Sequence, residues 1–171
     1  WEDVVLDEPR ESSDRYLLTP ENIKAFAAEW DPFAPHVDEA AAAKSPIGQL
    51  FAVGVHLLSV TIRLSHTIPS GETASIAGRG WDKLRFHRPG VAGDELRARV
   101  THVERGPGSR PERGVLVSRF ELLNQRDELV VDGEAEILAP RKQQTVTLPT
   151  LPAITVGVRP STTKPSVAAS E

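Results

Sequence analysis

The residues of this sequence best suited to chemistry are an aspartate and a histidine five positions apart, Asp31 and His36. Asp31 stands at the expected end of a helix, where the helix dipole disfavours a carboxylate. Pro32 and Pro35 restrict the backbone and could hold both side chains in a fixed relation. A carboxylate and an imidazole held together suit general acid–base catalysis on water. The spacing leaves a structural alternative open, in which Asp31 begins an Asp-Pro turn and His36 caps the next helix.

Other chemistries find less support in the sequence. His36, Asp38 and Glu39 superficially resemble metal ligands, but no second cluster with ligand spacing follows, so no metal site is predicted. The chain has no cysteine, which excludes disulfides, thiolate metal sites and cysteine nucleophiles.

Helices are expected in the first half of the chain. Thr19-Pro20 predicts a helix start, and the helix must end at or before Asp31 because Pro32 follows. Residues 31–36 are expected to be stiff and non-helical, and residues 38–44 to form a short alanine-rich helix. Ser45-Pro46 then predicts a longer helix over 46–66, apolar on nearly every side, as is typical of a helix in the middle of a fold.

Strands are expected from residue 73 onward. Segments near 74–88, 96–101, 115–123 and 129–137 are apolar or alternate between apolar and polar residues, with a loop over 106–114 and turns at 93–94 and 124–127. The loops between these strands are mostly short, which favours an antiparallel sheet. Helices followed by strands indicate an α+β fold.

Length and charge limit the organisation of the chain. The 171 residues suffice for one domain, expected over 1–140, followed by a Pro/Thr/Ser-rich tail over 141–171 without a core of its own. The net charge of −4 provides no field that attracts nucleic acid or an anionic membrane. Residues 47–64 are too polar for a membrane span, and the acidic beginning does not resemble a signal peptide, so a cytoplasmic location is expected.

A longer pattern surrounds the aspartate and the histidine. Asp31 is followed after four residues by His36 and two residues later by Asp38, and Gly54-Val55-His56 lies further on in a predicted helix. The whole run resembles the MaoC-like dehydratases and (R)-specific enoyl-CoA hydratases. Residues 84–89, 93–94 and 120–125 resemble later strands and turns of that family, so the resemblance covers roughly residues 10–140.

The resemblance implies a hot-dog fold, in which a curled antiparallel sheet wraps around a central helix over about residues 46–66. It also implies a homodimer, a double hot-dog in which two sheets join edge to edge and the active sites lie at the interface.

The same resemblance implies a hydro-lyase of fatty acid metabolism that hydrates 2-enoyl-CoA or dehydrates 3-hydroxyacyl-CoA. Asp31 would act as base or acid toward the water and His36 would orient it. The Gly54 N–H would stabilise the enolate-like thioester oxygen, with Val55 and Ser59 as further substrate-binding residues. The partner is an acyl-CoA or acyl-carrier thioester, and no cofactor is expected beyond the coenzyme A of the substrate.

Several of these residues have structural alternatives. Gly54 could be a packing glycine, Ser59 could bond to its own helix backbone, and a satisfied core histidine is the favoured interpretation of His56. Four basic residues could meet coenzyme A phosphates, although a solvated strand face is favoured for most of them: Arg79, Lys83, Arg85 and Arg88. Competing functions are a hot-dog acyl-CoA thioesterase and a non-catalytic acyl-thioester-binding subunit.

Overall fold

Helices occupy the first half of the described chain and long strands the second half. The computed structural model describes residues 4–69 and 75–140. Its elements are β1 (Pro9–Glu11), β2 (Tyr16–Leu17), α1 (Pro20–Trp30), α2 (Ala34–Val37), α3 (Glu39–Ala43), α4 (Gly54–Ser65), β3 (Ala77–Phe86), β4 (Glu95–Pro107), β5 (Arg113–Leu123) and β6 (Leu129–Pro140).

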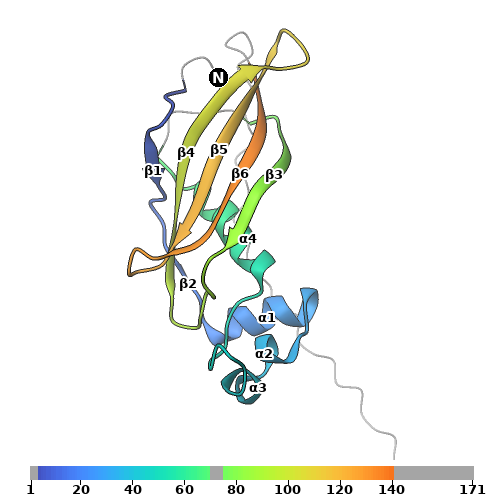
Figure 1. Ribbon diagram of the computed structural model, residues 1–171, viewed down its shortest axis with the longest axis vertical. Coiled ribbons are helices and arrows are strands. Elements are labelled where there is room, and N and C mark those ends of the chain that lie inside the picture. Colours follow the sequence, from blue (N-terminus) through green and yellow to red (C-terminus); the bar gives the residue numbers. More distant parts are fainter. Residues whose placement is uncertain (1–3, 70–74, 141–171) are drawn as a thin grey trace, which may run out of the picture.

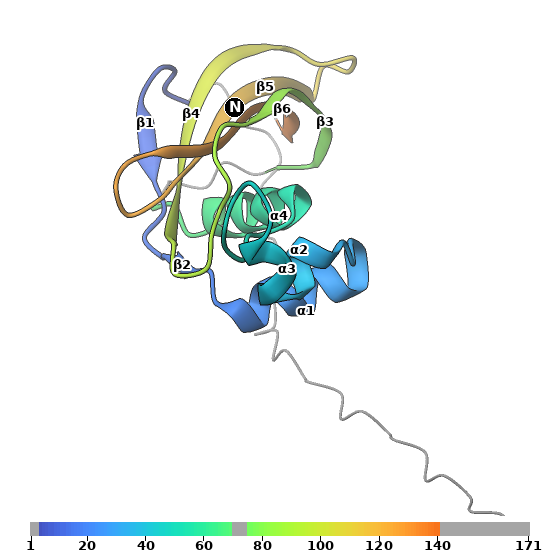
Figure 2. The same ribbon diagram turned by 60° about the horizontal axis from the view of Figure 1, so that its bottom comes forward.

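The strands form one antiparallel sheet that curls around α4. The order is β1-β4-β5-β6-β3, and the short strand β2 pairs with the beginning of β4. Figure 2 shows the sheet arched over α4, while α1, α2 and α3 gather at one end of that helix (Figure 1). This confirms the predicted α+β hot-dog fold, with the central helix covered by strands from the second half of the chain.

The core lies between α4 and the inner face of the sheet. Buried and less buried residues alternate along β4 and β5, as period-two side-chain geometry requires for a half-buried sheet. The buried face of these strands meets the buried side of α4 in one apolar cluster, which includes Leu57, Val60, Leu64, Leu96 and Leu122.

The helix α1 begins and ends where local signals predict. The Thr19 hydroxyl accepts a hydrogen bond from the Asn22 N–H, and the Asn22 side chain accepts one from the Thr19 N–H, which closes a capping box. The helix ends at Trp30, one residue before Asp31-Pro32. Asp31 is therefore the C-cap residue, as the sequence predicted.

The central helix is shorter than predicted, because it begins at Gly54 rather than at residue 46. Ser45 follows the end of α3 and does not cap α4, since its hydroxyl donates to the Ala42 carbonyl oxygen of α3. Beyond it, the Ala52 N–H donates to the Gly90 carbonyl and the Ala92 N–H to the Leu50 carbonyl. Pairing with a segment distant in the chain thus keeps residues 50–52 extended.

The expectation that residues 31–36 are non-helical was also wrong in part. Residues 34–37 form the single helical turn α2, although the segment 31–36 was expected to be non-helical. Pro35 lies in the first turn of α2, where its missing N–H has no helical partner to lose. The expected loop over 106–114 is narrower, because β4 extends to Pro107 and β5 starts at Arg113.

The expected tail over 141–171 lies outside the described residues. In the part of the chain that the structure describes, no helix combines the length and the apolar character that crossing a membrane requires.

Candidate active site

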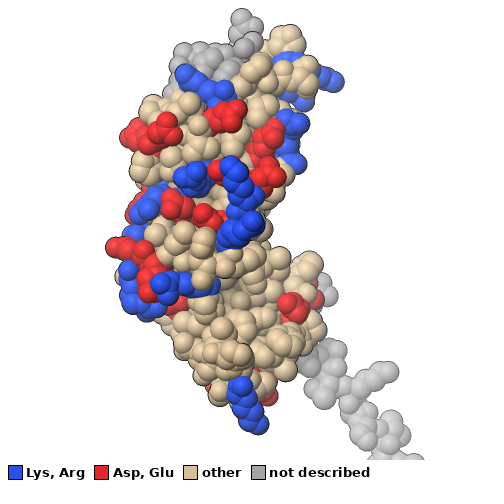
Figure 3. All heavy atoms as spheres, in the orientation of Figure 1, with Lys and Arg blue, Asp and Glu red and all other residues tan. Residues whose placement is uncertain are grey.

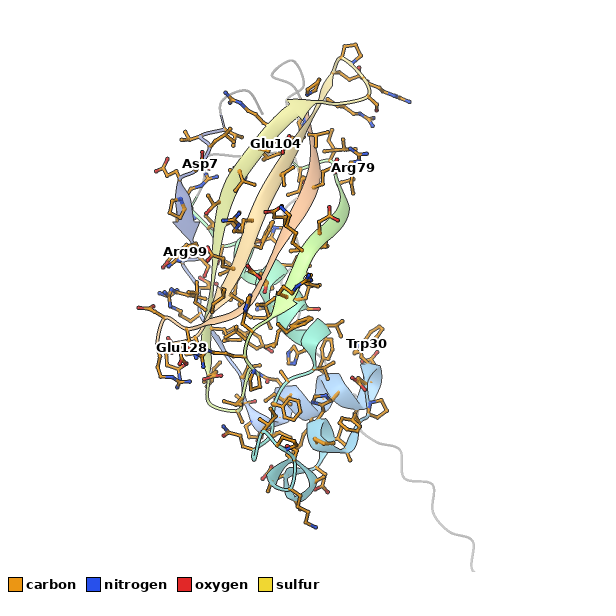
Figure 4. All side chains as sticks on the ribbon, in the orientation of Figure 1. Asp7, Trp30, Arg79, Arg99, Glu104 and Glu128 are labelled. Carbon is orange, nitrogen blue, oxygen red and sulfur yellow. The ribbon has the colours of Figure 1, made fainter. Side chains whose placement is uncertain are left out.

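Asp31 lies half-buried at the end of α1, in the part of the molecule where α1, α2 and α3 gather (Figure 1). Its N–H donates to the Ala27 carbonyl at 2.9 Å, and its own carbonyl accepts from the Phe33 N–H at 2.8 Å. Both backbone groups are thus engaged, and the carboxylate is carried by a fixed backbone. Trp30, just before it, is 66% exposed and projects from the end of α1 (Figure 4).

His36 lies on α2 and is buried. Its Nδ1 atom is 2.9 Å from the carbonyl oxygen of Phe51, in the extended segment that leads into α4. A carbonyl oxygen can only accept, so Nδ1 carries the proton of this bond, and Nε2 is the nitrogen that can take up or release a proton. The rings of Phe33 and Phe51 flank the imidazole, with centroids at 5.7 and 4.5 Å.

The beginning of α4 supplies hydrogen-bond donors. Val53 precedes the helix and provides no side-chain cap, and the N–H groups of His56 and Leu57 both donate to the Val53 carbonyl. The N–H groups of Gly54 and Val55 come earlier in the turn and have no partner inside the helix. They lie at the positive end of the helix dipole, which favours negative charge.

The ring of Phe86, at the end of β3, covers Gly54. A Cβ atom at position 54 would stand 3.0 and 3.1 Å from two Phe86 ring atoms, closer than ordinary contact. A packing role for Gly54 therefore has a definite partner. That role does not conflict with a donor role for its N–H.

Val55 and Ser59 lie one turn apart on the exposed side of α4. The Ser59 hydroxyl donates to the Val55 carbonyl at 2.8 Å, which is the in-helix bond that the sequence alternative expected. Val55 is 53% exposed, and Phe33 and Phe86 are exposed to a similar extent. These three side chains, here called the apolar rim, lie beside Gly54 or His36, and exposed apolar side chains suit an acyl chain or an interface.

The structure joins α2 to the approach of α4 through the bond from His36 to Phe51, and β3 to the start of α4 through Phe86 and Gly54. Whether Asp31 and His36 share one water stays a prediction. Phe51 and Phe86 were not expected at the site from the sequence. Phe51 acts through its backbone carbonyl, which no side-chain type signals, and Phe86 could have been noticed only as the aromatic residue in the stretch 84–89.

Most of the basic residues considered for coenzyme A phosphates have acidic partners on the outer face of the sheet, where the two signs of charge intermingle (Figure 3). Arg79 pairs with Glu136, Lys83 with Glu134 at 2.8 Å, and Arg88 with Glu128 at 3.6 Å. The Arg85 guanidinium donates to the Leu84 carbonyl. This agrees with a solvated strand face.

Asp38 and Glu39 have structural partners. The Asp38 carboxylate accepts from the Ala41 N–H at 2.8 Å and caps α3, and Glu39 forms an ion pair with Lys24.

A curled antiparallel sheet around a central helix, with a buried histidine bonded to the segment that leads into that helix, is the fold of the hot-dog proteins. A model of the MaoC like domain matches residues 3–118, and the chain belongs to this family.

Particular relatives support the assignment. The chain is 31% identical to the protein YdeM of Bacillus subtilis over 126 residues, which cover 72% of this chain and 87% of YdeM. A crystal structure of a MaoC-like dehydratase from Rhodospirillum rubrum superposes with a TM-score of 0.77 at 34% identity, covering 84% of this chain and 97% of that one. An unliganded (R)-hydratase from Pseudomonas aeruginosa superposes with a TM-score of 0.66 at 29% identity, covering 91% and 95%.

A further structural relative bears on the fold alone. The protein Rv0216 of Mycobacterium tuberculosis, described as a double hot-dog, superposes with a TM-score of 0.68 at 19% identity. The match covers 85% of this chain but 45% of Rv0216, so this chain corresponds to about half of that protein.

Proposed function

We propose that this chain is a hydro-lyase acting on acyl thioesters, which reversibly hydrates 2-enoyl-CoA and dehydrates 3-hydroxyacyl-CoA. The observation that carries the proposal is the hydrogen bond from His36 to the Phe51 carbonyl. It holds the imidazole against the segment that leads into α4, whose first turn has no side-chain cap. The names of two relatives, a dehydratase and an (R)-hydratase, support the same chemistry.

The proposed reaction assigns a role to each residue. In the hydration direction the water oxygen bonds to the β-carbon of the enoyl thioester, and Asp31 accepts one proton from that water. His36 orients the water through Nε2, and the pair returns a proton to the α-carbon, so the double bond becomes a single bond. The N–H of Gly54 stabilises the negative charge that develops on the thioester oxygen.

The substrate in this proposal is an acyl-CoA or acyl-carrier thioester. Its acyl chain would lie against the apolar rim, where Val55 and the helix face around Ser59 are exposed. Coenzyme A enters only as part of the substrate.

We also propose that the protein works as a homodimer. Among the described strands, β3 ends the sheet, pairs only with β6 and exposes most of its residues. An unpaired edge of ten residues is a template for pairing with a second copy. Joining two β3 edges would make one continuous sheet, and a molar mass by light scattering tests this directly. A monomer that retains full turnover at micromolar concentration would contradict the dimer.

The test of the function uses purified protein and a short 2-enoyl-CoA. We expect loss of the enoyl thioester absorbance and formation of the 3-hydroxyacyl product. Release of free thiol would establish the thioesterase alternative instead. Binding without turnover of either kind would indicate a non-catalytic acyl-thioester-binding subunit.

A further inference from the structure

His56 connects α4, which begins at Gly54, to α1, which Asp31 caps. It lies in the first turn of α4, two residues after Gly54, and is 3% exposed. Its ring stacks face to face on Phe26 of α1, with centroids 4.4 Å apart and planes within 4° of parallel. Phe26 lies five residues before Asp31, the C-cap of α1, so the stack joins the helix that carries Asp31 to the start of α4.

A third element is joined to the same imidazole. The His56 Nε2 atom is 3.3 Å from the hydroxyl oxygen of Tyr16 on β2, and the two rings meet edge to face. β2 pairs with β4, so the hydrogen bond connects the ring to the sheet. His56 is thus held from two directions, by α1 through its face and by the sheet through its edge.

The second ring nitrogen of His56 lowers stability, which a purely structural role does not explain. Within the described residues, the Nδ1 atom of His56 is buried and has no hydrogen-bond partner. Burial lowers the pKa of His56, which favours the neutral ring. A phenylalanine could stack on Phe26 without burying an unsatisfied nitrogen, so stability alone does not explain a histidine here.

We propose that His56 is a positioning residue for the hydration reaction, which sets the spacing between Asp31 at the end of α1 and the Gly54 N–H at the start of α4. This inference rests on the proposed function. His56 acts through the elements that it joins and does not exchange a proton with substrate. Acid–base chemistry and oxyanion stabilisation depend on spacing, because small displacements of reacting groups slow the reaction strongly.

The test compares four single variants of the full chain, and the double variant of two of them, with the parent in hydration of a short 2-enoyl-CoA. His56→Leu removes both the stack and the hydrogen bond, His56→Phe keeps the stack, and Tyr16→Phe removes only the hydrogen bond. Thr61→Val is the control, because Thr61 is a buried α4 residue whose hydroxyl bonds within the helix to Leu57.

We expect His56→Leu to lower kcat by about tenfold to a hundredfold. The kcat of His56→Phe and of Tyr16→Phe should fall less. The kcat of the double variant with both changes should fall no further than that of the more affected single variant. KM should change little in each. The melting temperature of His56→Phe should equal or exceed that of the parent, and Thr61→Val should keep the parent kcat. A crystal structure of His56→Leu should show α1 displaced relative to the start of α4.

Other outcomes separate the inference from the proposed function. A kcat for His56→Leu within about twofold of the parent overturns the inference alone. A fall in kcat that parallels the fall in melting temperature and also occurs in Thr61→Val would likewise overturn the inference. The same holds if one limb of the pH profile of kcat disappears in His56→Phe, because His56 would then exchange a proton. A parent that hydrates no enoyl thioester overturns the proposed function, and the inference with it.

Discussion

The imidazole of His36 and the backbone carbonyl of Phe51 are joined by a hydrogen bond of 2.9 Å. The bond fixes which nitrogen of His36 carries a proton, and it ties α2 to the segment that leads into α4. Because the acceptor is a backbone atom, the orientation of the histidine depends on the path of the chain and not on the side chain at position 51.

His36→Ala should lower the turnover of an enoyl thioester by about a hundredfold or more, as loss of a positioned acid–base group usually does. Phe51→Leu is the matched control, since it removes the ring against His36 but keeps the carbonyl oxygen. It should retain most of the turnover. Equal losses in both variants, measured as kcat, would show that packing around His36 matters more than its nitrogens.

Asp31→Asn should leave the fold intact and remove hydration, because the amide retains the shape of the carboxylate but not its basic oxygen. Asp38→Asn is the control. Asp38 caps α3 through the Ala41 N–H, and asparagine caps helices equally well. Circular dichroism checks the fold and the enoyl absorbance checks turnover. An Asp31→Asn protein as active as the parent would leave Asp31 as a turn residue only.

Local signals predicted one end of the candidate site well. The capping residue Thr19 marks the start of α1 and the dipeptide Asp31-Pro32 marks its end, so the position of Asp31 at the helix end follows from neighbouring residues. The start of α4 could not be predicted this way. The Ser45 hydroxyl is used at the end of α3, and residues 50–52 are held extended by the distant residues 90–92.

The contacts that hold the site are less visible in the sequence than its reactive residues. Asp31 and His36 stand out by type and spacing, and Gly54 by the family resemblance. Phe51 instead contributes a carbonyl, and Phe86 approaches from a distant strand. His56 was interpreted as a satisfied core histidine. It is buried, but one of its nitrogens lacks a partner among the described residues, which only three-dimensional packing reveals.

Gly54→Ala tests what the glycine at the start of α4 provides. The added methyl group would press on Phe86, whose ring is half exposed and can move, so the expected cost in stability is below about 1 kcal/mol. If the thioester approaches the Gly54 N–H closely, the same methyl group obstructs substrate and kcat/KM falls. Adding Phe86→Ala should then not restore kcat/KM. Full restoration by Phe86→Ala would show that Gly54 only makes room for that ring.

Stability should depend on pH through a histidine remote from the candidate site. His102 on β4 lies directly opposite Ser118 on β5, and its Nδ1 atom is 2.8 Å from the Ser118 hydroxyl. Both side chains are buried on the inner face of the sheet. Burial, with a smaller contribution from the positive charge of Arg10, lowers the pKa of His102 from its ordinary value of 6.5 to about 4.

The direction of the effect follows from which state binds more protons. Between pH 6.5 and about 4 the unfolded chain protonates His102 while the folded chain does not. The free energy of unfolding should therefore be constant with respect to this group above pH 6.5 and fall as the pH drops toward 4, by roughly 3 kcal/mol at most. His102→Gln keeps a hydrogen-bonding group beside Ser118 but cannot titrate. Urea unfolding of both proteins across this range isolates the contribution of His102 from that of the carboxylates and of His56. The parent should lose stability more steeply than His102→Gln as the pH falls, and parallel curves would contradict the assignment.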